Sequence, residues 1–550
     1  MPTLSKTIIT ACFHTRKDNP MKNRTILNRK ALSALLAVVL AAGLITAPVS
    51  VFADTASSAQ ETTASASVST DPLIKAEHYT IDASLNTKTK QITESVTMHV
   101  VNNSEKTVSK LCIVNIADGY LKYDRKNYSA DVKKSAQTTV REISSAGHPL
   151  SYKKGRDASD LYVSLGDKKL SRGDSIDVTV KATTSIPKRE DRFGYTSLSG
   201  GKTLYNLSFC FPYLSDYRNG KWNTHPYYDD GENRNNAIAD YNVTFRAPSD
   251  YTVASVGKST TSKGITTIKA ENVRDMAICT SNAYKKQTFT TNGITVNNYY
   301  FPGKYQKTKY MNLYNKVCRM VAQDSISLYT KNIGAYPYDE LDMVECLFGF
   351  GFGGMEYPGL IMINGTQEYL AKKQSTCDFY AIQDDVSHEI GHQWFYAAVG
   401  NDEYNEAWLD EGMACFLQSV EYGLSSTPST AYVDRLEHSP GQTAKLAEGF
   451  RSDILRRIKE QQKTGRKLYI NYPVNKFPKN LDSAEIPYSR AKTFMYELYV
   501  TMGPDTFHQA MQDYYRTYCL KQATGADFLR IIRKHDNSKA VQSVIKTFIR

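Results

Sequence analysis

Residues 387–394 read Ser-His-Glu-Ile-Gly-His-Gln-Trp. On a helix, positions four residues apart lie on one face, so the imidazoles of His388 and His392 can reach one metal ion. Glu389 stands beside them, where it can contact a metal-bound water rather than the metal. A hydrolytic site needs a third protein ligand and a fourth position left for water. The stretch therefore predicts a helix that carries two ligands of a metal centre.

The third ligand is predicted to be Glu411, nineteen residues after His392 in the run Trp-Leu-Asp-Glu-Gly that ends at Gly412. The apolar pattern there predicts a second helix, and an antiparallel helix pair with a short connector would return Glu411 to the two histidines. Two histidines and one glutamate in this motif favour one Zn²⁺ per chain over iron or another metal. Such a zinc centre acidifies water and polarises a carbonyl group.

The 550-residue chain is too long for one ordinary domain, and its 41% hydrophobic and 23% charged residues are typical of a soluble globular protein. Short alternating runs from His78 predict an antiparallel β domain at residues 73–290. Beyond it the apolar residues recur at helical spacing, interrupted by a β-rich stretch at Glu340–Ile363. We expect a multidomain α+β protein whose second domain spans residues 291–550.

The N-terminus predicts export. Residues 21–53 have the basic start, apolar run and small-residue cleavage pattern of a signal peptide. We therefore expect Met21 to be the true start and residues 1–20 to be a non-native extension. Gly43 and Pro48 in the apolar run disfavour the alternative of a membrane anchor. Residues 54–72 are rich in Ser and Thr and predict a linker. We expect a secreted protein, cleaved near Ala53 and either free or associated with the cell envelope.

The net charge of +12 does not indicate a nucleic-acid partner. Half of the excess lies in residues 1–53, and the rest is spread over nearly 500 residues without a basic stripe.

The nine cysteines include no Cys-x-x-Cys pair, so a zinc ribbon is excluded and the disulfide pairing stays open. No other stretch is apolar enough to cross a bilayer, so we expect no membrane span in the mature protein.

Three motifs together carry a resemblance to a known family. They are Gly-Gly-Met-Glu-Tyr-Pro-Gly at 353–359, His-Glu-x-x-His at 388–392 and Trp-Leu-Asp-Glu-Gly at 408–412. In order and spacing the chain resembles the aminopeptidase N-like gluzincin zinc metallopeptidases. The resemblance implies an N-terminal antiparallel β-sandwich-like domain followed by a thermolysin-like, mostly helical α/β catalytic domain. The chain looks like a short bacterial-type member without the C-terminal helical domain, whose cleft should admit longer peptides.

The resemblance also implies roles for single residues. Glu389 resembles the general base that takes a proton from the zinc-activated water. Glu356 matches the glutamate that binds the free α-amino group of the substrate, with Gly353 and Met355 beside the peptide backbone. Tyr488 matches the tyrosine that stabilises the tetrahedral oxyanion. The chain departs from the family pattern at Tyr357, Asp410, Arg490 and Ala491, and these departures concern substrate preference rather than zinc binding.

We expect a secreted zinc aminopeptidase that acts on peptides with a free N-terminus. An endopeptidase is the nearer alternative, and it would arise if Glu356 does not engage the α-amine. A catalytically silent peptide-binding module of the same fold is the alternative from another class. The intact set His388, Glu389, His392, Glu411 and Tyr488 favours an enzyme. The preferred first residue, the physiological substrate and the oligomeric state do not follow from the sequence.

Overall fold

The computed structural model describes residues 71–119, 137–156, 159–208, 210–225, 236–302, 309–349, 352–366, 369, 377–436, 469–477 and 485–550. All of them belong to one compact unit, Thr70–Arg550. The predicted extension, the signal peptide and nearly all of the predicted linker lie outside the described residues. Among the described residues we find no helix that is both long and apolar enough to span a bilayer.

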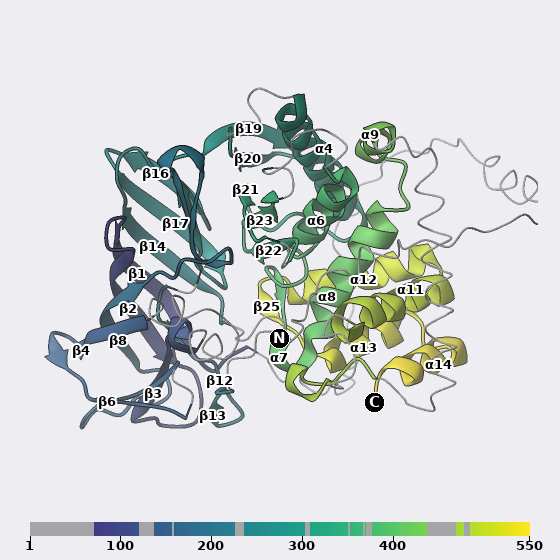
Figure 1. Ribbon diagram of the computed structural model, residues 1–550. Helices are drawn as coiled ribbons and strands as arrows, with labels where there is room; N and C mark the ends of the chain where they lie inside the picture. Colours follow the sequence, from purple (N-terminus) through teal and green to yellow (C-terminus); the bar gives the residue numbers. More distant parts are fainter. Residues whose placement is uncertain are drawn as a thin grey trace, which may run out of the picture. The chain divides into compact units, whose positions relative to one another are not determined.

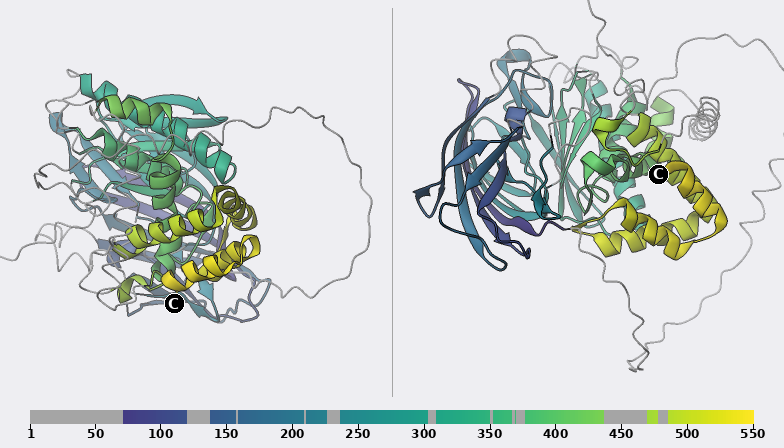
Figure 2. Two further views of the ribbon diagram at one scale, coloured as in Figure 1. Left: turned by 90° about the vertical axis from the view of Figure 1, so that its right-hand side faces the viewer. Right: turned by 90° about the horizontal axis from the view of Figure 1, so that it is seen from below.

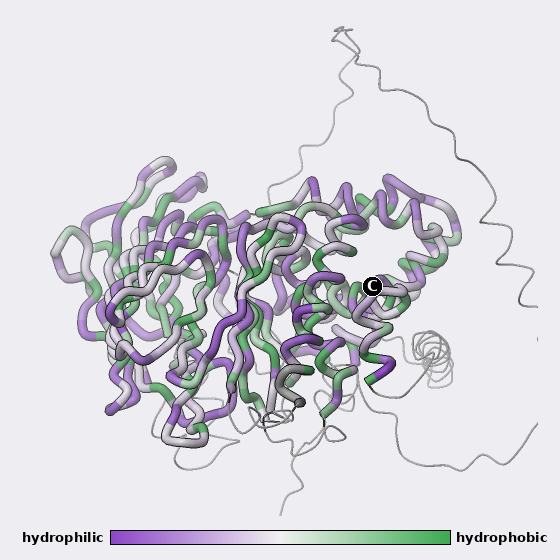
Figure 3. Tube along the Cα trace, turned by 90° about the horizontal axis from the view of Figure 1, so that it is seen from above, coloured by the Kyte–Doolittle hydropathy of each residue, from purple (hydrophilic) through white to green (hydrophobic). Residues whose placement is uncertain are grey.

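The largest sheet of the described chain is a ten-stranded sheet in the N-terminal half (Figure 1). Side chains alternate along its strands: Ile176, Val178 and Val180 of β8 are buried and their neighbours are not. This alternation appears along the tube in Figure 3 as short changes between green and purple. The strands are β1 (Ile74–Asn86), β2 (Gln91–Asn102), β4 (Gln137–Ser145), β5 (His148–Pro149), β8 (Ser175–Ser185), β12 (Tyr217–Arg218), β13 (Lys221–Trp222), β14 (Ala239–Arg246), β16 (Lys258–Ser262) and β17 (Ile265–Val273).

Two four-stranded sheets share one apolar core with this sheet. Most neighbours pair antiparallel, as predicted, but β1 pairs parallel with β14, starting with His78 opposite Asp240. The strands of the two smaller sheets are β15 (Thr252–Ser255), β18 (Ile278–Ser281), β10 (Thr203–Leu207) and β9 (Phe193–Ser197), then β11 (Tyr213–Leu214), β3 (Lys110–Val114), β7 (Asp160–Ser164) and β6 (Tyr152–Lys154).

A five-stranded sheet opens the second half. Its strands, in spatial order, are β19 (Lys285–Thr291), β20 (Ile294–Tyr300), β21 (Glu340–Cys346), β23 (Leu360–Asn364) and β22 (Gly354–Tyr357). The inner strands β20, β21 and β23 pair parallel, and both edge strands pair antiparallel. β21 and β23 are buried almost throughout, as expected for strands covered on both faces. The predicted domain boundary at residues 290–291 falls inside β19, which pairs with β20 along its whole length.

Helices make up most of the remainder. Figures 1 and 2 show α4 and α6 against the five-stranded sheet, and the helices share one core with it. Polar residues start several of them: Asp378 accepts from the Ala381 amide, and Thr524 and Asp527 form a capping box. The helices are α4 (Lys309–Asn332), α6 (Phe379–Gly391), α7 (Glu403–Glu406), α8 (Glu411–Phe416), α9 (Pro428–Leu436), α11 (Ala491–Met502), α12 (Pro504–Tyr518), α13 (Gly525–His535) and α14 (Lys539–Phe548).

The predicted fold class, a β-rich N-terminal half followed by a mostly helical α/β half, is confirmed. Two details differ. Apolar residues continue at helical spacing to Val399, but α6 ends at Gly391, and the chain turns at Tyr396, whose φ is 123°. The connector to Glu411, predicted only to be short, contains the short helices α7 and Ala407–Leu409.

Candidate active site

The three predicted metal ligands converge at the start of α8 and the end of α6. His388 lies in the last turn of α6, His392 follows its last residue, and Glu411 is the first residue of α8. Nε2 of His388 lies 3.1 Å from Nε2 of His392. Oε2 of Glu411 lies 3.4 Å from the first and 3.5 Å from the second of these nitrogens. The three ligand atoms therefore form a nearly equilateral triangle.

This triangle fits zinc. A tetrahedral zinc site with metal–ligand distances of about 2.0–2.1 Å has edges of about 3.3 Å between ligand atoms. Oε2 of Glu411 is buried and has no hydrogen-bond partner among the described residues. An unpartnered carboxylate oxygen facing two imidazole nitrogens is costly without a cation between them. Two nitrogens and one oxygen are also the donor set that zinc prefers in hydrolytic sites.

Each imidazole is oriented through its other nitrogen. Nδ1 of His392 lies 2.6 Å from Oδ1 of Asp410 and 3.2 Å from the carbonyl of Phe395, so it carries the proton and donates. Nδ1 of His388 faces a thiol instead, with Sγ of Cys415 at 3.9 Å. Both arrangements leave Nε2 pointing at the ligand triangle, as metal binding requires. The predicted site had not included Asp410, which stood out only as a departure from the family pattern.

Glu389, the predicted general base, is 4% exposed, and its Oε2 has no hydrogen-bond partner among the described residues. Burial, and after it the neighbouring carboxylate of Glu356, raise the pKa of Glu389 well above its ordinary value. Gly354 makes room for this side chain: a Cβ on that glycine would collide with the Glu389 carboxylate. One oxygen of Glu389, next to His388 in the chain, thus has no hydrogen bond from the part of the chain that the structure describes.

Glu356 lies on β22 beside the metal ligands. One of its carboxylate oxygens lies within 4.8 Å of a ring nitrogen of His392, and its side chain is 5% exposed. Adjacent strand residues face opposite sides, so the Met355 side chain points the other way and its Sδ lies 3.4 Å from Nη1 of Arg192. Gly353 passes Asp385, with no space for a Cβ. Gly353, Met355 and Glu356, which were predicted to bind the substrate together, thus have different surroundings.

Tyr488 enters the site from the helical turn Glu485–Arg490, which precedes α11. Its hydroxyl donates to Oε1 of Glu411, and its ring lies 6.3 Å from that of His388. Burial, followed by the Glu411 charge, raises the pKa of Tyr488 well above its ordinary value, so the hydroxyl keeps its proton. The structure therefore brings Tyr488 together with the three ligands, Glu389 and Glu356.

Comparisons with known proteins agree with this geometry. Residues 292–548 match the Peptidase family M1 domain. The chain is 29% identical over 134 residues to human endoplasmic reticulum aminopeptidase 2, a match that covers 24% of this chain and 13% of the relative. It is 23% identical over 258 residues to aminopeptidase 2 of Candida albicans, covering 44% of this chain and 26% of that protein. The matched stretches thus span about a quarter or less of these curated relatives.

The fold extends the likeness beyond the matched sequence. An M1 zinc metallopeptidase from Deinococcus radiodurans superposes with a TM-score of 0.55 at 13% identity, over 88% of this chain and 95% of that one. A variant of that enzyme solved with the substrate Tyr-Ser-Ala gives 0.55 at 14% identity, over 86% and 94%. The resemblance to aminopeptidase N-like metallopeptidases is confirmed, and the choice of zinc agrees with the names of these solved relatives. Residues 292–548 of this chain therefore form a Peptidase family M1 domain.

Proposed function

We propose that the chain is a zinc-dependent aminopeptidase, which removes residues from the N-termini of peptides. The observation that carries the proposal is the ligand triangle of His388, His392 and Glu411 flanked by two further carboxylates, Glu389 and Glu356. The matched relatives named as aminopeptidases support the same reaction class.

Each of these side chains has a chemical task. Zinc held by the triangle would supply Lewis acid chemistry, which polarises a carbonyl and lowers the pKa of water. Glu389 accepts a proton from the attacking water and returns it to the leaving amine, which needs an oxygen that is otherwise unbonded. The hydroxyl of Tyr488 donates to the substrate oxygen as its negative charge develops.

Glu356 is the residue that favours cleavage at the N-terminus of a peptide over cleavage at an internal bond. A buried carboxylate near the ligands binds a cationic α-amino group strongly, because a charge-assisted hydrogen bond gains strength away from water. An internal peptide bond has no such amine to offer. Substrates with a free N-terminus are therefore favoured, and the scissile bond is the first one.

The test is mass spectrometry of digests made by the full chain, using free and N-acetylated versions of one peptide. We expect successive single-residue losses from the free peptide only. Internal cuts in both peptides would replace the aminopeptidase by an endopeptidase. Intact peptides in the presence of protein shown to hold zinc would refute the enzymatic proposal and leave a peptide-binding module.

We also propose that the protein is exported, on the signal-like pattern of residues 21–53. The experiment is N-terminal sequencing of the protein recovered from medium and from cells. A mature N-terminus near Asp54 is expected. Recovery only inside cells with an uncleaved N-terminus would contradict export.

A further inference from the structure

We propose that Arg274 and Asp275, which follow β17, are positioning residues for the metal ligand His392. They act by holding residues 395–398, the segment that comes directly after the second histidine. The inference rests on the zinc site of the proposed function, and it adds residues from the N-terminal half to that site.

Arg274 is a buried cation bound by backbone carbonyls. The residue is only 1% exposed. Its Nε donates to the carbonyls of Tyr396 at 2.7 Å and Ala397 at 3.2 Å. Nη2 donates to Lys521 at 2.7 Å and to Ala398 at 3.4 Å. The guanidinium fills the space beside Gly400, where a Cβ would collide with it. The carbonyls of residues 396–398 come five to seven residues after Gly391, the last residue of α6.

Asp275 holds the same segment by a side chain. Its carboxylate accepts hydrogen bonds from the hydroxyl of Tyr396 and from Nδ2 of Asn236. Tyr396 has a φ of 123°, a left-handed conformation that side chains other than glycine rarely adopt. Such a conformation persists only where the surroundings impose it. Arg274 binds the backbone carbonyl of Tyr396, and Asp275 binds its side-chain hydroxyl. Together the two residues hold Tyr396 in this backbone conformation.

The segment in turn touches His392. The carbonyl of Phe395 lies 3.2 Å from Nδ1 of His392, and the amide of Ala397 donates to the His392 carbonyl at 3.0 Å. A shift of residues 395–398 would therefore remove an acceptor from the ring and alter the backbone that carries it. Acceptors behind a metal-binding histidine set the ring orientation and the metal affinity.

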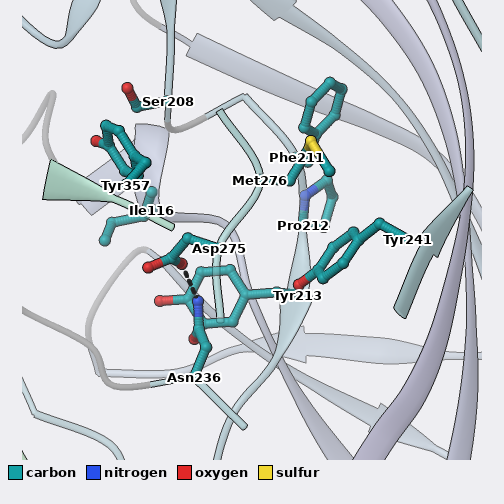
Figure 4. Close-up of a pocket in the computed structure, with 10 residues that line it drawn as sticks. All are labelled: Ile116, Ser208, Phe211, Pro212, Tyr213, Asn236, Tyr241, Asp275, Met276 and Tyr357. Atoms are coloured by element: carbon teal, nitrogen blue, oxygen red, sulfur yellow. Dashed lines mark hydrogen bonds between the residues drawn. The ribbon is translucent and has the colours of Figure 1, made fainter. Parts of the chain in front are cut away.

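Asp275 also borders a small cavity of about 40 Å³, shown in Figure 4. Asn236, Tyr213 and Tyr357 line it as well, and Tyr357 directly follows Glu356 on β22. The lining of this cavity includes polar side chains, and a space of this size accommodates water. Removing the Asp275 carboxylate would thus leave Asn236 and the Tyr396 hydroxyl able to bond to water, so variants at this position are expected to fold.

The experiment measures the zinc affinity of the full chain by competition with a chelator, together with the melting temperature. R274M, D275A and Y396F are expected to bind zinc about 10- to 100-fold more weakly. D275N is expected to stay near the wild type, because an amide can accept from Asn236 and donate to the Tyr396 hydroxyl. The double variant D275A/Y396F should bind zinc no more weakly than D275A alone, because each single substitution already removes the hydrogen bond between Asp275 and Tyr396.

N102A is the matched control. Asn102 is fully buried and also binds backbone carbonyls, those of Lys106 and Leu170, but it lies in β2 far along the chain from the zinc ligands. It should lower the melting temperature without changing zinc affinity. Zinc affinity unchanged in R274M and Y396F would overturn the inference, as would an equal weakening by N102A. A wild-type chain that binds no zinc would instead refute the proposed function itself.

Discussion

The carboxylate of Asp410 and Nδ1 of His392 lie 2.6 Å apart, and this contact fixes which ring nitrogen is free to bind a metal. Asp410 directly precedes Glu411, so two consecutive residues supply the acceptor that orients His392 and a predicted metal ligand. The side chains of the predicted zinc site thus orient one another.

Replacing Asp410 should weaken metal binding. We expect D410A to lower zinc affinity about 10- to 100-fold, because the His392 ring loses its charged acceptor. D410N should lose less, since its side-chain oxygen still accepts from Nδ1. Chelator competition measures the affinity, and D378A, which removes the N-cap at the other end of α6, is the control. Equal zinc affinity in D410A and the wild type would contradict this reading of the contact.

Glu389→Gln should separate metal binding from turnover. The amide occupies the same space but takes up no proton, so kcat should fall about 10²- to 10⁴-fold while one zinc per chain remains. Steady-state kinetics and elemental analysis give the two quantities. E94Q, which replaces a buried carboxyl of β2, should keep full activity. Wild-type turnover in E389Q would remove Glu389 from the role of base.

Glu356→Ala should act on substrates through their N-terminal amine. Loss of a charge-assisted hydrogen bond of about 1.5–3 kcal/mol lowers kcat/KM about 10- to 100-fold for peptides with a free N-terminus. The measurement is kcat/KM for one such peptide in E356A and the wild type, with zinc content determined in both. An unchanged kcat/KM at full zinc occupancy would show that this carboxylate does not bind the amine.

Glu94 should make stability depend on pH. Burial in the large sheet raises the pKa of Glu94 to about 8, against which the hydrogen bond from Thr184 acts weakly. The folded state therefore keeps a proton that the unfolded chain releases near its ordinary pKa, so this stabilisation is present at low pH and is lost as pH rises from about 5 to 8. A difference of a few kcal/mol is expected over that window. E94Q should flatten the fall in melting temperature between these pH values, and an unchanged profile would contradict the raised pKa.

Local patterns predicted the parts of the site that depend on short spacing. The four-residue step between His388 and His392 needs only a helix, and it is present. The end of that helix did not follow, because apolar residues continue through Val399 while the backbone turns at Tyr396. The parallel pairing of β1 with β14 joins strands more than 150 residues apart, and a strand's own alternation does not state its partner.

The sequence did not reveal the contacts of residues that act on distant parts of the fold. Arg274 is one basic residue at the end of an alternating strand, and its importance lies in carbonyls more than 120 residues downstream. Asp410 was visible as a departure from a family pattern, but its bond to His392 required the three-dimensional structure. The sequence therefore indicated the candidate site residues, whereas the contacts that orient them required the structure.

Gly412 lies against Ala491, and a Cβ on this glycine would stand 2.5 Å from the Ala491 methyl group. One position adjoins the ligand Glu411 and the other adjoins the turn that carries Tyr488. Alanine is the smallest residue with a side chain. Only glycine at position 491 could therefore make room for a larger residue at position 412. In evolution these two positions should consequently change as a pair or remain as they are, and this couples the histories of two segments almost eighty residues apart.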